Sequence, residues 1–350
     1  MKKTLLLLPL LALLCTSCEV EFSPNAEWRE IPVAYCLLDQ DDDTSFVRIQ
    51  RCFMGEGDQR TYTTVPDSIY YPSDALQVFI EEWTCRYTSQ GVAYRTGSAP
   101  QRYFQFQYAE LSNKDSGQFA NTLQPVYYCP TAGLLDTNCL YRLRVVKNNS
   151  THDTLLSAET NLITGQMKLQ RPNSLNKFRF NGTAGNKSCE FTWTTIAQAR
   201  QYQPIVRFQY RDFIIDRSTT PWDTTIIPHY LDIQGPTVKS NMTDATNTTH
   251  MEETNYFLAI QQALQGDTCN KNYIDTVLVY ITCCTEPLAA YLYARNPSGV
   301  INQEPFTYTN IEGGLGLFGA RRTHLYFKVA TPNSAADAYV KSLKALNVGF

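Results

Sequence analysis

The segment 140–146 restricts the fold of this chain more than any other feature. Its residues, Leu-Tyr-Arg-Leu-Arg-Val-Val, belong to the types that favour strands, and turn residues follow at 148–150. Residues 154–160 then return as an antiparallel partner. Similar strand signals occur upstream, at 31–38, 46–53, 76–85, 92–96 and 103–108. Short strands without a convincing helix predict an immunoglobulin-like β-sandwich over residues 30–165, although the Cys…Trp…Cys spacing of antibody domains is absent.

The composition changes at residues 161–175, where Gly165, Pro172 and Asn173 interrupt the strand pattern. We therefore place a domain boundary after residue 165. Residues 166–350 are predicted to form a second, β-rich α+β domain with three short helices. The expected helices are 255–264, 286–296 and 335–346, with Thr254, Thr285 and Ser334 as N-caps. The expected strands are 177–180, 189–194, 205–214, 274–284 and 324–330.

Two long segments are predicted to be loops. Residues 55–72 are rich in Thr, Asp and Tyr, and residues 219–249 are rich in Thr, Pro and Asn. Long loops on a rigid β scaffold suit recognition of a ligand or partner.

The N-terminus has the pattern of a secretory signal. A basic start, Met1-Lys2-Lys3, precedes a leucine-rich core at 5–14 and the small residues before Cys18. A run this short cannot span a bilayer, which takes about 20 apolar residues. Cleavage before Cys18 would expose its thiol for lipidation, so residues 1–18 are predicted to be a lipoprotein signal peptide and 19–29 a tether. The alternative is an ordinary secreted protein whose Cys18 joins a disulfide.

Charge and cysteine content exclude several classes of function. Loss of Lys2 and Lys3 with the signal changes the formal net charge from −3 to −5, and this dispersed negative charge argues against nucleic-acid binding. Of eleven cysteines, nine remain without Cys15 and Cys18, so at least one is free or pairs between chains. No Cys-x-x-Cys occurs and there are four histidines, so no zinc site is predicted. Cys283 and Cys284 lie in an apolar run and are expected to be buried thiols.

Two motifs resemble ligand sites and are interpreted as structural. Asp39, Asp41 and Asp43 have the spacing of the first calcium ligands in a binding loop. Thr44 stands where a glycine is needed and Gln50 where a glutamate is needed, so a solvated acidic hairpin is favoured. Residues 314–319 match G-x-G-x-x-G, but a strand pattern follows instead of a helix. We expect a tight glycine-rich connection with positive φ.

No catalytic or cofactor-binding residue is predicted. The four histidines, His152, His229, His250 and His324, are scattered and belong to no metal or nucleophile motif. The chain has 22 tyrosines, a number consistent either with a ligand platform or with strand formation, and strand formation is favoured. The densest aromatic segments surround Tyr62, Tyr70, Tyr71, Trp83, Tyr87 and Tyr94.

Residues 306–319, Phe-Thr-Tyr-Thr-Asn-Ile-Glu-Gly-Gly-Leu-Gly-Leu-Phe-Gly, resemble the closing motif of a Bacteroidota outer-membrane lipoprotein family of unknown function. Residues 139–160 resemble the end of the N-terminal domain of that family. Phe191-Thr-Trp193, with Ala199 and Tyr202, resembles the opening of its second domain. The resemblance implies a lipid-anchored protein, often beside a TonB-dependent transporter, with an immunoglobulin-like first domain. In that family an acidic cluster directly after the lipidated cysteine favours export to the cell surface, whereas only Glu19 and Glu21 stand directly after Cys18 here. The cell-surface and periplasmic faces therefore both stay open.

Three hypotheses follow. The first is a non-catalytic outer-membrane lipoprotein that acts as a binding or accessory subunit, of a TonB-dependent transporter or another envelope complex. The second is an exported hydrolase whose site assembles from distant residues. The third is a structural or adhesive surface protein.

Overall fold

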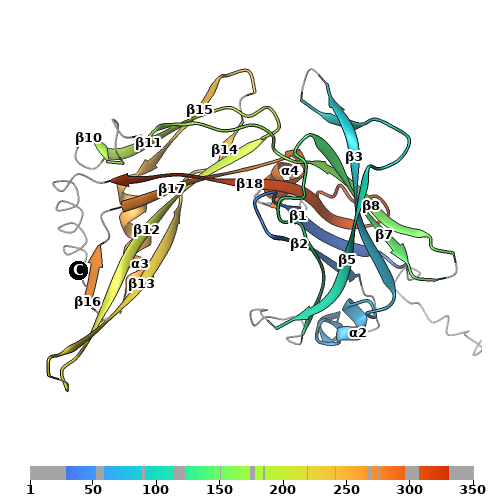
Figure 1. Ribbon diagram of the computed structural model, residues 1–350, viewed down its shortest axis with the longest axis horizontal. Coiled ribbons are helices and arrows are strands. Elements are labelled where there is room, and N and C mark those ends of the chain that lie inside the picture. Colours follow the sequence, from blue (N-terminus) through green and yellow to red (C-terminus); the bar gives the residue numbers. More distant parts are fainter. Residues whose placement is uncertain are drawn as a thin grey trace, which may run out of the picture.

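The computed structural model describes residues 29–52, 59–88, 91–112, 123–149, 151–173, 178–183, 186–218, 220–240, 242–265, 270–273, 276–295 and 307–330. This part of the chain is mainly β, with one 14-stranded mixed sheet and one four-stranded antiparallel sheet. Figure 1 shows the strands gathered in two lobes that β18 (Leu315–Ala330) joins. Each lobe has its own hydrophobic core. The predicted fold class is therefore confirmed at the level of a mainly β protein.

The first lobe is built from β1 to β8. β5 pairs with β3 through residues 102–106 and with β6 through residues 107–111, so the sheet turns a corner at this strand. Both parts supply alternate side chains to one core, including Val47 and Ile49 from β2 and Val78 and Ile80 from β3. The strands are β1 (Pro32–Leu38), β2 (Thr44–Arg51), β3 (Leu76–Tyr87), β4 (Ala93–Arg95), β5 (Arg102–Leu111), β6 (Gln124–Pro130), β7 (Cys139–Lys147) and β8 (Thr154–Asn161).

The second lobe is organised around β12 (Gln201–Asp216), which pairs with four other strands. Its core is aromatic: the rings of Trp193 and Tyr202 lie 5.5 Å apart, and both side chains are fully buried. The other elements are β9 (Leu169–Arg171), β10 (Asn181–Thr183), β11 (Asn186–Thr194), β13 (Asp223–Gln234), β14 (Val238–Lys239), β15 (Thr246–Glu252), α3 (Glu253–Leu264), β16 (Asn270–Tyr273), β17 (Thr276–Cys284) and α4 (Glu286–Arg295).

β18 belongs to both lobes. Its first residues pair in parallel with β1, and the whole strand from Arg321 onward pairs antiparallel with β17. Phe318 and Ala320 are buried in the core of the first lobe. Residues from the C-terminal part of the sequence thus complete the core that its N-terminal part forms. A division of the chain at residue 165 assigns these residues to different domains.

The glycine-rich segment leads into β18. Gly316 has φ +115°, and a Cβ atom there would lie 2.0 Å from the carbonyl oxygen of Ala34 on β1. Gly313 also has positive φ, as expected for a tight connection. Asn310 closes the turn, because its Nδ2 donates to the Phe318 carbonyl at 2.7 Å and its Oδ1 accepts from the Phe318 N–H at 3.0 Å. Close backbone approach to β1, in addition to the turn, explains why these positions are glycine.

Several predicted elements are confirmed and others are wrong. α3 and α4 are the expected helices, but Thr254 lies inside α3, and the Thr285 side chain bonds the backbone of Ala320. Residues 219–249, predicted as loops, contain β13, β14 and the first residues of β15. Residues 55–72, also predicted as a loop, include the 3₁₀ helix η1 (Gln59–Thr64) and α2 (Pro66–Ile69). The helix expected at 335–346 lies outside the described residues.

Within the described residues, no helix is both long and apolar enough to cross a membrane. The proposed lipidation residue Cys18 and the tether at 19–28 lie outside the described part of the chain.

Candidate binding surfaces

One candidate ligand site is a cleft of about 840 Å³ in the first lobe, which we call the tyrosine cleft. It lies where the end of β2 meets segment 66–73 and the adjoining ends of β5 and β6. Its volume falls in the range of small-molecule and peptide pockets, about 300–1,000 Å³. The lining residues are Arg51, Pro66, Asp67, Tyr70, Tyr71, Pro72, Ser73, Tyr108, Glu110, Leu123 and Pro125.

The local sequence explains how the cleft forms. Pro66 is suited to the first turn of a helix, and the short α2 that it opens ends with the buried Ile69. The chain then continues in extended conformation, which holds Tyr70 and Tyr71 against the lobe, where both are more than nine-tenths buried. Arg51 donates from Nη2 to the Asp67 carbonyl and so fastens α2 to the end of β2.

The polar groups of the cleft include both hydrogen-bond donors and hydrogen-bond acceptors. The Arg51 guanidinium lies 5.7 Å from the centre of the Tyr71 ring. Tyr108 donates its hydroxyl to Glu110 Oε1 at 2.9 Å, and burial together with this bond raises the pKa of Tyr108 to about 12. The Tyr70 hydroxyl is buried and has no hydrogen-bond partner among the described residues. A buried hydroxyl left unpaired costs roughly 1–3 kcal/mol, so a ligand group that accepted a hydrogen bond from it would recover this free energy.

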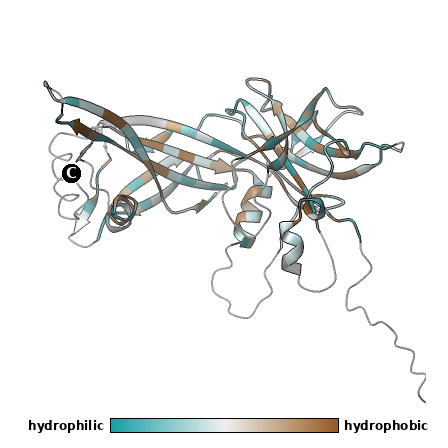
Figure 2. Cartoon of the chain, turned by 90° about the horizontal axis from the view of Figure 1, so that it is seen from below, coloured by the Kyte–Doolittle hydropathy of each residue, from teal (hydrophilic) through white to brown (hydrophobic). Residues whose placement is uncertain are grey.

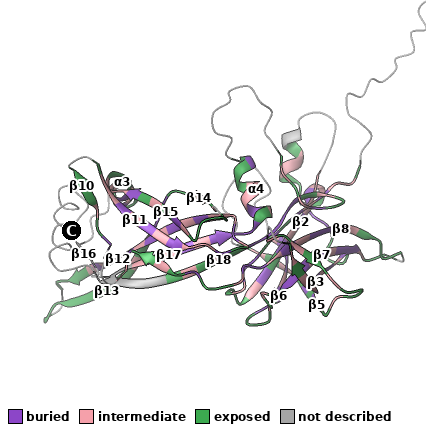
Figure 3. Cartoon of the chain, turned by 90° about the horizontal axis from the view of Figure 1, so that it is seen from above, coloured by how far each residue is buried: buried purple, intermediate pink, exposed green. Residues whose placement is uncertain are grey.

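The second candidate surface is the arm, defined as residues 214–227 at the tip of the β12–β13 hairpin. β12 pairs with β17 through Arg207 and with β16 through Phe213, so residues 214–216 pair with β13 alone. Figure 1 shows this hairpin projecting from the second lobe, and Figure 3 shows its exposed end. Large apolar side chains remain exposed there: Ile214, Ile215, Trp222, Ile226 and Ile227.

The arm presents apolar groups on both faces. Successive strand residues point to opposite faces, so Ile226 and Ile227 lie on different sides, as do Ile214 and Ile215. The colouring in Figure 2 shows apolar stretches along the same hairpin. The Trp222 side chain is 62% exposed, with the Arg217 guanidinium 5.3 Å from its ring. Exposed apolar groups gathered in this way are typical of a protein-binding site.

Polar contacts stiffen the base of the arm. Arg207 forms two bonds to the Asp232 carboxylate, at 2.6 and 2.7 Å, and lies over the rings of Tyr230 and Tyr280. His229 Nε2 lies 3.0 Å from the Asp212 carboxylate. β13 is the edge strand of the sheet and carries Pro228, which has no N–H to offer an added strand. The faces of the arm, more than its free edge, are therefore suited to docking.

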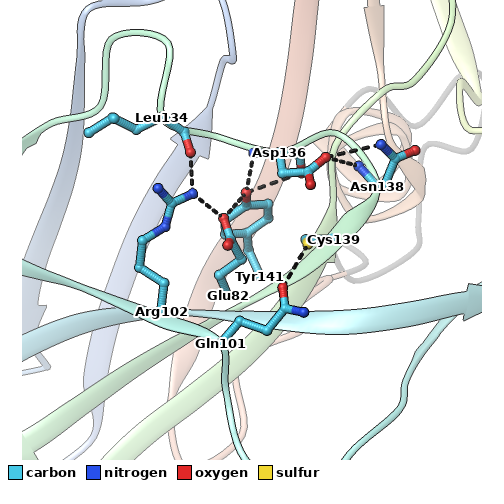
Figure 4. A network of polar contacts seen from close by, with 8 residues as sticks. All are labelled: Glu82, Gln101, Arg102, Leu134, Asp136, Asn138, Cys139 and Tyr141. Carbon is cyan, nitrogen blue, oxygen red and sulfur yellow. Dashed lines mark hydrogen bonds and ion pairs between the residues drawn. The ribbon is translucent and has the colours of Figure 1, made fainter.

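The first lobe contains a network of buried polar contacts that supports its fold (Figure 4). Tyr141 donates its hydroxyl to Glu82 at 2.7 Å and accepts the Asp136 N–H at 2.7 Å. Arg102 pairs with the same Glu82 carboxylate at 2.7 Å and also donates to the Leu134 carbonyl. These bonds hold the 131–138 connection against the sheet. No sequence pattern marks the residues of this network.

The neighbouring Glu81 does not form a catalytic pair with Glu82. Adjacent residues on β3 point to opposite faces, and Glu81 pairs with Arg144 at 2.7 Å and accepts the Trp83 indole N–H at 3.1 Å. Each carboxylate is thus committed to its own cation. Two acidic groups converging on one cavity, as in a glycoside hydrolase, are not formed by these residues.

The acidic hairpin at residues 39–43 is ion-paired. Asp39 is only 6% exposed and lies 3.6 Å from Arg321, while Asp41 bonds Arg322 at 3.0 Å. Asp39 is buried, so the expectation of a fully solvated hairpin is wrong at this residue. Two guanidinium groups occupy the place that a cation would need, and the described residues contain no cluster of three or more His, Cys, Asp or Glu able to hold a metal.

The cysteines of the described residues are free thiols. Cys283 and Cys284 are buried, as predicted, and burial raises the pKa of each to about 12. Cys269 and Cys18 lie outside the described residues. Thiols with raised pKa are poor nucleophiles, so these two are expected to be inert.

The structure brings together some of the residues that the sequence singled out. Tyr70 and Tyr71 share the tyrosine cleft, whereas Trp83 is buried beside Glu81 and Tyr94 is exposed on β4. Sequence reasoning missed Arg51, Tyr108 and the arm. The alternating stretch 103–108 placed Tyr108 on a strand but carried no sign of the cleft.

A scan against models of protein families finds no match, and a search of curated proteins finds no similar sequence.

Proposed function

We propose that this protein is an outer-membrane lipoprotein, anchored through a lipid on Cys18, that acts as a non-catalytic accessory subunit. Its partner is a TonB-dependent transporter or another barrel protein of the envelope. The proposal includes an immunoglobulin-like arrangement in the first lobe, an α+β second domain, and membership of the Bacteroidota family suggested by residues 306–319. The lipoprotein-type N-terminus and the resemblance at residues 306–319 support it.

The arm is the observation that carries the proposal. In the isolated protein its isoleucines are 38–49% exposed and Trp222 is 62% exposed, although buried apolar surface stabilises by about 25 cal/mol per Å². A partner that clasps both faces of the hairpin would recover this free energy. Trp is also among the residues that contribute most to binding at protein interfaces.

The position of the arm fits a tethered subunit. β1 and β2, which follow the tether in sequence, lie in the first lobe, whereas the arm extends from the other lobe (Figure 1). A lipid attached on the side of the first lobe would leave the arm, which extends from the other lobe, free to contact a partner. Glu81 and Glu82, the two adjacent buried carboxylates of the first lobe, are each paired with an arginine and do not form a hydrolytic pair.

The test is an affinity pull-down after crosslinking in intact outer membranes. We expect the wild-type protein to recover one barrel protein in stoichiometric amount. Cys18→Ala should abolish recovery because the protein is no longer held at the membrane. The double variant Trp222→Ser with Ile226→Thr should remain anchored and yet lose the partner.

A matched control separates docking from folding. Tyr103→Thr alters a side chain that is 55% exposed on β5 of the first lobe and should leave recovery unchanged. Recovery of the protein alone in every case would overturn the accessory-subunit proposal. If the arm variant still recovers the partner, the docking site lies outside the arm and the arm does not support the proposal.

A further inference from the structure

The tyrosine cleft is a second candidate site, independent of the arm. It lies in the other lobe, and none of its lining residues belongs to the second lobe. Its walls combine three tyrosines, Tyr70, Tyr71 and Tyr108, with three prolines, Pro66, Pro72 and Pro125. Rigid rings of this kind offer large contact area while losing little conformational entropy on binding.

The hydrogen-bonding groups on the walls of the cleft differ from those on its rim. On the walls, the Tyr70 hydroxyl has no partner among the described residues, and the Arg51 guanidinium donates from Nη2 to the Asp67 carbonyl and keeps further N–H groups. The Tyr108 hydroxyl is already bonded to Glu110. Carboxylates lie at the exposed rim, on Asp67 and Glu110. The occupant should therefore offer acceptors and ring-like apolar groups to the walls, and a cation to the rim.

A proline-rich chain has this chemistry. Proline has no N–H, and a polyproline II helix makes no internal hydrogen bonds, so its carbonyls stay available as acceptors. Such segments dock into aromatic-lined grooves, and their stiffness lowers the entropic cost of binding. A lysine or arginine beside the prolines would meet Asp67 and Glu110.

The buried hydroxyl of Tyr70 supports a ligand that accepts hydrogen bonds. It has no partner among the described residues, although it belongs to a cleft-lining side chain. A small side-chain rotation, of the kind common at binding sites, would turn it toward an occupant. Loss of this one oxygen should therefore weaken binding without harming the fold.

We propose that the tyrosine cleft binds a proline-rich peptide segment in the polyproline II conformation, with a basic residue next to the prolines at the Asp67–Glu110 rim. This proposal does not depend on the arm or on the identity of the membrane partner.

The test uses the full lipidated protein in detergent and fluorescent peptides measured by anisotropy. The probes are six prolines followed by arginine, six prolines alone, and a proline-free peptide of the same length and charge as the first. A soluble neutral oligosaccharide serves as competitor. We expect saturable binding of the proline–arginine peptide, weaker binding of six prolines, and no binding of the proline-free peptide.

Three variants locate the site. Tyr108→Ala should weaken binding about tenfold or more, as loss of an aromatic anchor does. Tyr70→Phe should weaken it about threefold while leaving thermal stability unchanged or higher. Glu110→Gln should weaken only the arginine-containing peptide, by about threefold, because an exposed charge pair contributes little.

Tyr103→Ala is the matched control, because Tyr103 lies on the same strand as Tyr108 but on the opposite face. It should leave all affinities within twofold. Equal binding of the proline-free peptide, or binding that Tyr108→Ala does not weaken, would overturn the proposal. Displacement of the peptide by the oligosaccharide would also overturn it and assign the cleft to a saccharide.

Discussion

β12 and β18 are both 16-residue strands, but they end in opposite environments. The start of β18 pairs with β1. Phe318 and Ala320 are buried there in the core of the first lobe, and Leu317 is buried against Leu288 of α4. The end of β12 forms the arm, where Ile214 is 48% exposed. Both stretches contain the residues that favour strands, so strand preference does not distinguish them. The two strand ends differ in the residues that pack against them. This packing determines how much a substitution should lower the free energy of unfolding.

The largest expected effect is at the junction of β1 and β18. Gly316→Ala places a Cβ 2.0 Å from the Ala34 oxygen, at a φ that side chains rarely adopt, so the strands must separate. We expect a loss of about 4 kcal/mol or more in the free energy of unfolding, measured by urea denaturation. Gly133→Ala is the control: its φ is +63° but no atom lies within 4 Å, so it should cost about 1 kcal/mol. Equal costs would mean that the junction is not closely packed.

The next effect concerns the turn that leads into the junction. Asn310→Ala removes both side-chain bonds to the Phe318 backbone and leaves its N–H and carbonyl without these partners. We expect a loss of about 2–3 kcal/mol. Asn148→Ala removes exposed bonds at the end of β7 and should change stability by less than about 0.5 kcal/mol. If the two variants unfold at the same urea concentration, the Asn310 side chain does not stabilise the turn.

The pH dependence of stability has two opposing contributions near the junction. Burial raises the pKa of Asp39 to about 6, so the folded state holds this proton more tightly and stability falls, by about 2 kcal/mol, as the pH rises from about 4 to 6. Burial lowers the pKa of His324 on β18 to about 4, so its contribution to stability grows as the pH rises from about 4 to 6.5.

Single variants should separate these contributions in thermal melts between pH 4 and 7. Asp39→Asn should leave a stability that increases with pH over this range. His324→Gln should leave a stability that decreases as the pH rises over the same range. Parallel curves for both variants and the wild type would show that neither group has a shifted pKa in the folded protein.

The smallest effect on stability is expected in the arm. Trp222→Ser and Ile226→Thr alter side chains that are 62% and 49% exposed, so each should change the free energy of unfolding by less than about 0.5 kcal/mol. Both changes should still abolish partner recovery if the arm docks as proposed. A large destabilisation would mean that these side chains already pack within the protein, and the contrast between arm and junction would fail.

The strand prediction succeeded where the pattern was local. The segment 140–146 lies within β7, 103–108 lies within β5, and helix 255–264 corresponds to α3. It failed at 219–249, where threonine and proline suggested loops, because the apolar pairs at 226–227 and 214–215 are strand residues that only hairpin pairing brings together. Threonine is itself a good strand former, and Pro228 is tolerated on an edge strand.

The sequence by itself determined the mainly β character of this protein and the positions of most strands and two helices. These are properties of short stretches, since alternation and turn residues act locally. Only the tertiary structure decided that Gly316 must approach Ala34, that Arg51, Tyr70 and Tyr108 share one cleft, and that the isoleucines of the arm stay exposed. Each of these depends on which distant strands become neighbours, because close approach and burial are set by long-range packing that no local pattern encodes.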